Sequence, residues 1–200
     1  MSSVRIRYSA LRTCAPKLTM FELDEYTSFI APNAQELTDF VMSLDSNLID
    51  NDKFAWGDKC KVDLISLSTE DYPSTKYDVR GLLKPSIDYL LSLKQVNIGF
   101  NKIDICDSWV NLYNKGGFQE THDHHEIDFV CVFFSNAGAN FSKFYFFDRD
   151  TGKDTLISPD PGTIMFFSSK RAHGVTLHND EVQRRTLSCN FEITRNHHYH

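Results

Sequence analysis

The feature that most constrains the fold is a succession of short β-type segments that fills the second half of the chain. Eight candidate strands lie at residues 97–105, 108–114, 129–135, 143–148, 154–157, 162–168, 174–178 and 184–193. Turn-forming residues separate them, for example Asn136 to Gly138, Gly152, and Pro159 to Gly162. Short strands at this spacing are typical of β-sandwiches, jelly rolls and barrels. We therefore expect a mainly β fold with a core of facing sheets.

Two helices are expected ahead of these strands. Asn33 precedes an apolar pattern of helical spacing, and Glu36 follows three residues later as in a capping box, so residues 34–46 are predicted to form an amphipathic helix. A second helix is predicted at about 79–94. Pro85 is expected to mark its first turn, because proline is tolerated at that position.

The order of helices before strands indicates an α+β organisation within one domain. Residues 1–200 are interpreted as a single domain, with an N-terminal helical cover over about 1–95 and a β-barrel core over about 96–195. One or two edge strands are expected within 17–30, and a further strand at 62–67. The helices are expected to pack on one sheet of the barrel.

Composition narrows the class of protein. The chain has 16 phenylalanines among its 200 residues, which favours packed β-strands, and a net charge of -6, which argues against non-specific nucleic-acid binding. Its five cysteines are dispersed and include no CxxC pair, as expected of reduced thiols in the cytoplasm. No stretch reaches the length of about 20 apolar residues that a membrane span needs, and the N-terminus lacks a signal-peptide core.

The histidines are concentrated in the second half of the chain, and His122 is the first of eight. His122 and His124 are two residues apart, so in an extended segment both rings point to the same face and can bind one metal ion. We expect the third ligand to come from a distant strand. His173 is the first candidate because it closely follows the strand at 163–167, and His178 is the reserve. Imidazole ligands suit Fe, Zn, Cu or Ni and do not choose among them.

An overlapping interpretation gives the metal a carboxylate ligand. His124, His125 and Glu126 also form a His-x-carboxylate unit, two members of the 2-His-1-carboxylate triad. Asp123, Glu126 and Asp128 therefore remain alternative ligands.

The last predicted strand carries a candidate anion clamp. Alternation places Arg184, Thr186, Ser188 and Asn190 on one face of it. An arginine forms a bidentate fork for a carboxylate, and a hydroxyl two residues on adds a bond to the same oxygens. Arg184 with Thr186 is thus predicted to bind one carboxylate of a dicarboxylic acid, and Arg185 replaces Arg184 if the register differs by one.

A third group precedes the histidines. Trp109, Asn111 and Tyr113 share one face of their strand and are expected to line the same cavity. Asn111 and Tyr113 are candidates to donate hydrogen bonds to the bound acid.

These residues together resemble a known family. The pattern W-x-N-x-x-x-K-G-x-F-Q-x-x-H-x-H, from Trp109 to His124, is similar to that of 2-oxoglutarate- and Fe(II)-dependent oxygenases found in phages and marine bacteria, whose core resembles the prolyl 4-hydroxylases. The similarity continues through the Pro161–Ser168 segment and through R-x-T-x-x-x-N-F, which begins at Arg184. It covers about residues 105–193, and His173 falls where the distal histidine belongs.

The resemblance implies a double-stranded β-helix with Fe(II) as cofactor and 2-oxoglutarate as cosubstrate. It implies that His122, His124 and His173 are metal-site positions, and that Arg184 with Thr186 holds the distal carboxylate. The implied reaction uses O2 to convert 2-oxoglutarate to succinate and CO2 while a small-molecule or peptide substrate is oxidised, most simply by hydroxylation. The chain departs from the wider superfamily in having His-x-His where His-x-Asp or His-x-Glu is usual.

Two rival functions remain open at this point. The spacing from Gly116 to Asp128 also resembles the first cupin motif, which predicts a metal-dependent dioxygenase or isomerase that binds metal through His122, His124, Asp128 and His173 without 2-oxoglutarate. The other rival is a non-catalytic jelly-roll binding protein. Neither rival needs a dicarboxylate clamp at Arg184.

Overall fold

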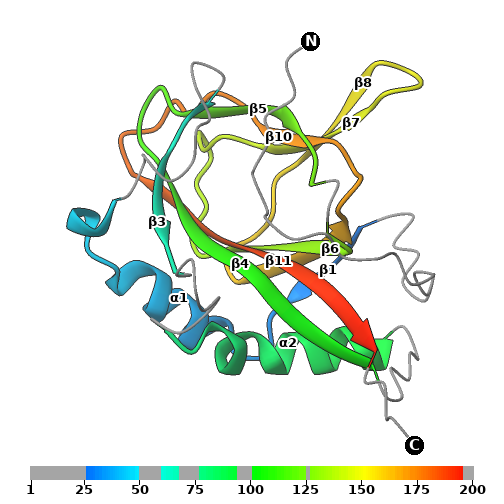
Figure 1. The fold of residues 1–200 in the computed structure, drawn as a ribbon. Coiled ribbons are helices and arrows are strands. Elements are labelled where there is room, and N and C mark those ends of the chain that lie inside the picture. Colours follow the sequence, from blue (N-terminus) through cyan, green and yellow to red (C-terminus); the bar gives the residue numbers. More distant parts are fainter. Residues whose placement is uncertain (1–25, 50–59, 68–76, 94–100, 125–126, 196–200) are drawn as a thin grey trace, which may run out of the picture.

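A computed structural model of the protein describes residues 26–49, 60–67, 77–93, 101–124 and 127–195. Its strands form two antiparallel sheets that face each other (Figure 1). The major sheet has the strand order β1 (Thr27–Ile30), β9 (Thr163–Ser168), β6 (Phe129–Phe134), β11 (Arg184–Arg195), β4 (Asn101–Tyr113) and β3 (Asp63–Ser66). The minor sheet has the order β2 (Cys60–Lys61), β5 (Phe118–His122), β10 (His173–Val175), β7 (Phe144–Asp148) and β8 (Lys153–Ile157).

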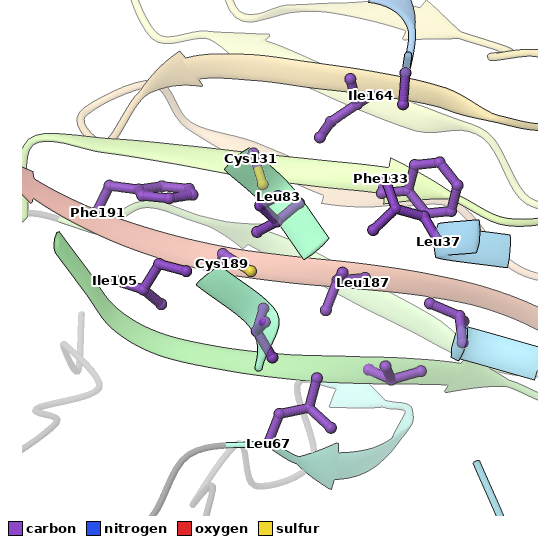
Figure 2. Close-up of a cluster of buried hydrophobic side chains, with 14 of the residues drawn as sticks. Leu37, Leu67, Leu83, Ile105, Cys131, Phe133, Ile164, Leu187, Cys189 and Phe191 are labelled. Atoms are coloured by element: carbon purple, nitrogen blue, oxygen red, sulfur yellow. The ribbon is translucent and has the colours of Figure 1, made fainter. Parts of the chain in front are cut away.

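Two α-helices cover the outer side of the major sheet, as the sequence predicts. They are α1 (Ala34–Ser43) and α2 (Val79–Leu93), and a short 3-10 helix, η1 (Ser46–Leu48), follows α1 (Figure 1). Figure 2 shows the apolar cluster in which Leu37 and Leu83 from the two helices meet Leu187 and Phe191 of β11. This cluster holds the helical cover on the sheet. Among the described residues, no helix is both long enough and apolar enough to cross a membrane.

Each predicted strand of the second half has a counterpart in the structure, with shifted ends and one merger, whereas β2 and β5 were not predicted. Segments 97–105 and 108–114 were expected to be separate strands, but the described part of them is the single strand β4, and residues 97–100 lie outside the described ranges. The apparent break is a β-bulge. Asn190 of β11 is opposite Asp107 and Phe191 is opposite Ile105, so Cys106 is the extra residue.

Two local predictions are wrong. Pro85 does not mark the first turn of α2, which begins at Val79 and carries Pro85 in its interior. Burial of Val79, Leu83 and Leu90 against the sheet outweighs the unfavourable helix propensity of proline.

Asn33 is the N-cap of α1, but its side chain caps no backbone N–H. Its amide donates instead to Glu36 and to the Leu82 carbonyl of α2.

The pairing of β4 with β11 positions polar side chains between the two sheets. Val110 and Leu112 of β4 and Leu187 and Cys189 of β11 point into the helix-covered core. The alternate residues therefore point to the interior. There Arg184 is opposite Tyr113, Thr186 opposite Asn111, and Ser188 opposite Trp109. A second apolar cluster, which includes Phe134, Phe144, Phe146 and Phe167, surrounds this polar row.

Candidate metal and anion site

Three histidines converge on one point of the minor sheet. His122 is the last residue of β5, His124 follows two residues later, and His173 begins β10, directly opposite His122 in the register. One side-chain nitrogen from each ring lies within 4.8 Å of the others. The structure thus brings together the three histidines that the sequence singled out. His122 belongs to strand β5, whereas His124 lies just beyond the end of that strand.

Hydrogen bonds fix the tautomer of two of these rings. Nδ1 of His122 lies 2.9 Å from the carbonyl oxygen of Glu120, and Nδ1 of His173 lies 2.8 Å from that of Arg171. Because a carbonyl only accepts, each Nδ1 carries the proton and donates it. Nε2 of both rings is left with a lone pair, as in histidine ligands whose second nitrogen is held by a carbonyl.

The same environment keeps these histidines neutral. Burial lowers the pKa of His122, and it lowers the pKa of His173 well below the usual value, with further lowering from the neighbouring His122 and His124. The ring of His124 stacks on Trp109 at a centroid distance of 6.2 Å. Metal ligation requires the neutral imidazole, and the lowered pKa values of His122 and His173 favour that form.

Two of the alternative carboxylate ligands, Asp123 and Asp128, do not join this group. Asp123 forms an ion pair with Arg149, and Asp128 accepts a hydrogen bond of 2.7 Å from the backbone N–H of Ile193. Neither belongs to the cluster of potential ligands that contains the three histidines. The side chain of Glu126 lies outside the described residues.

His178, the reserve ligand, is also elsewhere. Its ring is fully buried, and its two nitrogens contact Ser142 and the Val182 carbonyl. It does not belong to the three-histidine cluster.

Arg184 lies in the interior with 2% of its surface exposed. Its guanidinium carbon is 5.2 Å from the ring centre of Tyr113 and 5.5 Å from that of Phe134, and Nη1 donates to Ser142 Oγ at 2.8 Å. Burial lowers the pKa of the guanidinium to about 10, so it stays charged at neutral pH. No acidic side chain in the described part of the chain pairs with it. A buried cation without a counter-ion is a binding point for an anion.

The contacts of the neighbouring Arg185 decide which of the two arginines faces the interior. It points to the opposite face, where Nη1 donates to the carbonyl oxygens of Val41, Met42 and Leu44 at 3.2, 3.4 and 2.9 Å. Arg185 therefore holds the C-terminal end of α1, and Arg184 is the residue that reaches the interior.

The histidines and Arg184 line the same cavity. Its wall includes every residue that the sequence predicted for the anion site, namely Arg184, Thr186, Asn111 and Tyr113, together with Trp109. No aspartate or glutamate is among the described lining residues. The cavity is therefore suited to a metal ion at one part and an anionic group at another.

The two residues predicted to donate to a bound acid, Asn111 and Tyr113, direct their hydrogens to other residues of the wall. Asn111 Nδ2 donates to Thr186 Oγ1 at 3.1 Å and to Ser188 Oγ at 2.9 Å, and Tyr113 donates to Gln119 Oε1 at 3.0 Å. Burial raises the pKa of Tyr113, so the phenol keeps its proton. Because Thr186 Oγ1 accepts from Asn111, its own proton remains available for a ligand oxygen.

Two residues of this region escaped sequence reasoning. Gln119 lies inside the resembling motif, but its role as acceptor for Tyr113 depends on the fold. Ser142, the partner of Arg184, lies in a non-repetitive segment before β7, where periodicity gives no signal.

Comparisons with known proteins agree with this architecture. No protein-family model matches the sequence, and no curated protein sequence matches it. Among solved structures, a prolyl hydroxylase from Trichoplax adhaerens, in complex with a hypoxia inducible factor peptide, matches with TM-score 0.64 and 14% identity over 86% of each chain. A 2OG-Fe(II) oxygenase family oxidoreductase from Burkholderia pseudomallei matches with TM-score 0.62 and 12% identity, again over 86% of each.

A third similar structure contains ligands. HygX from Streptomyces hygroscopicus, with nickel and 2-oxoglutarate bound, matches with TM-score 0.57 and 9% identity, over 84% of this chain and 82% of that one. At these identities the likeness concerns the fold. The chain has the double-stranded β-helix fold that these oxygenases have, which confirms the fold predicted from its strands and its motif.

Proposed function

We propose that the protein is a 2-oxoglutarate- and O2-dependent, non-haem Fe(II) oxygenase that hydroxylates a small-molecule or peptide substrate. The observation that carries this proposal is the pairing, in one cavity, of three clustered imidazoles with a buried arginine that has no acidic partner among the described residues. In this proposal a metal ion binds the histidines, and a dicarboxylate bridges from the metal to the arginine. The fold and the ligands named for a similar structure support the same assignment.

The residues fit the proposed metal. His122, His124 and His173 hold Fe(II) in this proposal, and imidazole is a common ligand for it. When bound, Fe(II) supplies the activation of O2 that couples oxidation of the substrate to conversion of 2-oxoglutarate to succinate and CO2. Asp123, Glu126 and Asp128 have no place in the proposed ligand set. The site therefore has one negative charge fewer than a 2-His-1-carboxylate triad.

The chain's own residues orient the cosubstrate. Arg184 binds the distal carboxylate through its N–H groups, and the hydroxyl of Thr186 donates a further bond to it. Asn111 fixes the direction of the Thr186 hydroxyl by donating to its oxygen. Tyr113 closes the wall beside Arg184 and, with Phe134, excludes water from the guanidinium.

The same proposal covers the whole chain as a single oxygenase domain, related to the phage and marine bacterial oxygenases that its motif resembles. The described cysteines Cys60, Cys106, Cys131 and Cys189 are all free thiols, which supports a reducing cytoplasmic location.

Charge-transfer spectroscopy tests the proposal. Anaerobic protein with Fe(II) and 2-oxoglutarate is expected to show the weak visible metal-to-ligand band of the chelate, and Arg184→Ala is expected to abolish it at the same cosubstrate concentration. If the wild-type protein binds iron but 2-oxoglutarate produces neither the band nor protection from unfolding, a cupin-type enzyme is favoured. If no divalent metal binds, a non-catalytic jelly-roll binding protein is favoured.

A further inference from the structure

The support behind Arg184 is a second feature of the interior that the sequence did not predict. Ser142 lies just before β7, is 7% exposed, and accepts the only hydrogen bond from the Arg184 guanidinium within the described residues, at 2.8 Å. Four further guanidinium N–H groups are therefore left for a ligand. The direction of this one bond determines where those groups point.

His178 controls the direction of the Ser142 hydroxyl. Nε2 of His178 lies 2.9 Å from the Val182 carbonyl oxygen, so it carries the ring proton, and Nδ1 is an acceptor. The backbone N–H of Ser142 donates to that Nδ1 at 3.2 Å, and Ser142 Oγ lies 3.4 Å from it. With its proton directed toward Nδ1, an acceptor that it shares with the Ser142 N–H, the hydroxyl presents its lone pairs to Arg184.

His178 is itself held on both sides by the turn between β4 and β5. The N–H of Gly116 donates to the His178 carbonyl, and the N–H of His178 donates to the Gly117 carbonyl, both at 2.7 Å. The Phe141 ring packs edge-on against the imidazole at 5.0 Å. The turn itself requires the Gly116–Gly117 pair, because Gly116 has a φ of 81° and a Cβ on Gly117 would lie 2.8 Å from the Asn114 carbonyl oxygen.

We propose that Ser142 and His178 are positioning residues for the dicarboxylate clamp: they fix the Arg184 guanidinium in its binding orientation before the ligand arrives. This inference rests on the proposed role of Arg184 in binding 2-oxoglutarate. Its physical basis is preorganisation. A side chain that is ordered in the free protein loses less conformational entropy when the carboxylate binds. Ser142 and His178 thus contribute to affinity without being among the metal ligands.

The test compares two 2-oxo acids on protein loaded with Ni(II), which avoids turnover. 2-Oxoglutarate reaches Arg184 through its distal carboxylate, whereas pyruvate has the same chelating group and no distal carboxylate. Calorimetry is expected to show that Ser142→Ala weakens 2-oxoglutarate binding about tenfold, as expected for loss of a hydrogen bond to a charged group. Pyruvate binding is expected to stay unchanged. Ser142→Thr, which keeps the hydroxyl, is expected to restore most of the affinity.

Three controls separate positioning from general damage. Ser135→Ala removes another buried serine, which donates to the Arg185 carbonyl at 2.8 Å, and is expected to leave both affinities unchanged. His178→Asn keeps an acceptor near Nδ1 and is expected to bind 2-oxoglutarate more tightly than His178→Leu. In an Arg184→Ala background, Ser142→Ala is expected to have no further effect. Circular dichroism of each variant verifies that it is folded.

The outcomes distinguish this inference from the proposed function. If wild-type protein does not prefer 2-oxoglutarate to pyruvate, the proposed clamp itself is wrong. If the wild type shows that preference but Ser142→Ala keeps it, or weakens both acids equally, the positioning role is overturned. An effect of Ser142→Ala that persists without Arg184 overturns it as well.

Discussion

Replacing Arg184 with methionine is expected to stabilise the ligand-free protein while removing its capacity to bind the cosubstrate. Methionine has a similar length and is apolar, so it fills the space between Tyr113 and Phe134 without a charge. Replacing buried charges by apolar residues of similar volume is often stabilising by about 1–4 kcal/mol. The contacts of Arg184 allow the change in stability to be placed within that range.

The magnitude follows from two contributions. Burial lowers the pKa of Arg184 to about 10, and one pKa unit corresponds to about 1.4 kcal/mol, so the buried charge costs about 3 kcal/mol. The variant loses the bond to Ser142 Oγ, a loss of about 1 kcal/mol. The net gain of about 2 kcal/mol corresponds to a rise in Tm of about 4–8 °C for a domain of this size.

Thermal unfolding of metal-free protein measures this gain. Arg185→Met is the matched control, because the same substitution one residue along removes bonds to the α1 carbonyls and is expected to lower Tm. Addition of Ni(II) and 2-oxoglutarate is expected to raise the Tm of the wild type, since ligands that bind only the native state stabilise it, and to raise that of Arg184→Met less. A ligand-free Arg184→Met protein less stable than the wild type would refute the view that Arg184 is unneutralised.

Three other predictions concern the metal, helix α2 and the β4–β5 turn. His173→Ala is expected to weaken Ni(II) binding at least about a hundredfold, because each ligand contributes several kcal/mol. Asp123→Asn is expected to leave the Ni(II) affinity unchanged, and the reverse result in calorimetry would identify Asp123 as a ligand. Pro85→Ala is expected to raise the free energy of unfolding by about 1–3 kcal/mol, because alanine restores a helical N–H, and a decrease in a urea titration would show that the proline ring is needed for packing. Gly117→Ala is expected to lower stability by about 1–3 kcal/mol, because its Cβ meets the backbone oxygens of Asn114 and Lys61 at 2.8 and 2.9 Å, and an unchanged urea midpoint would contradict that close approach.

The parts of the site that the sequence predicted are those with a local spacing. His122 and His124 are two residues apart, and the alternation along β11 separates Arg184 from Arg185 once the polar and apolar faces are recognised. The apolar run Phe129–Phe134 gave β6 its bounds to within one residue. Along β11 a repeat of two residues carries the information, and the sheet preserves it. For β6 the information is a continuous apolar run, and His124 reaches the cluster from beyond the end of β5.

The parts that it did not predict depend on tertiary contacts. Ser142 supports Arg184 from a segment 42 positions earlier in the chain, and no periodic pattern marks it. Asn33 looked like the start of a capping box, but the Leu82 carbonyl of the neighbouring helix takes one of its donors. Pro85 was placed by local propensity, which packing against the sheet overrides. Sequence patterns cannot supply a partner that only the folded chain brings near.

The charges of the cavity have a consequence for the way its two ligands bind. The three imidazoles bring no negative charge, and Arg184 brings a positive one, so a divalent cation that enters alone is repelled by the guanidinium. A dianion relieves that repulsion, and the cation in turn strengthens the attraction for the dianion. In the proposed enzyme the metal and the cosubstrate are therefore thermodynamically coupled, and each must raise the affinity for the other by the same factor. In such a site the dianion supplies the negative charge that balances the metal ion.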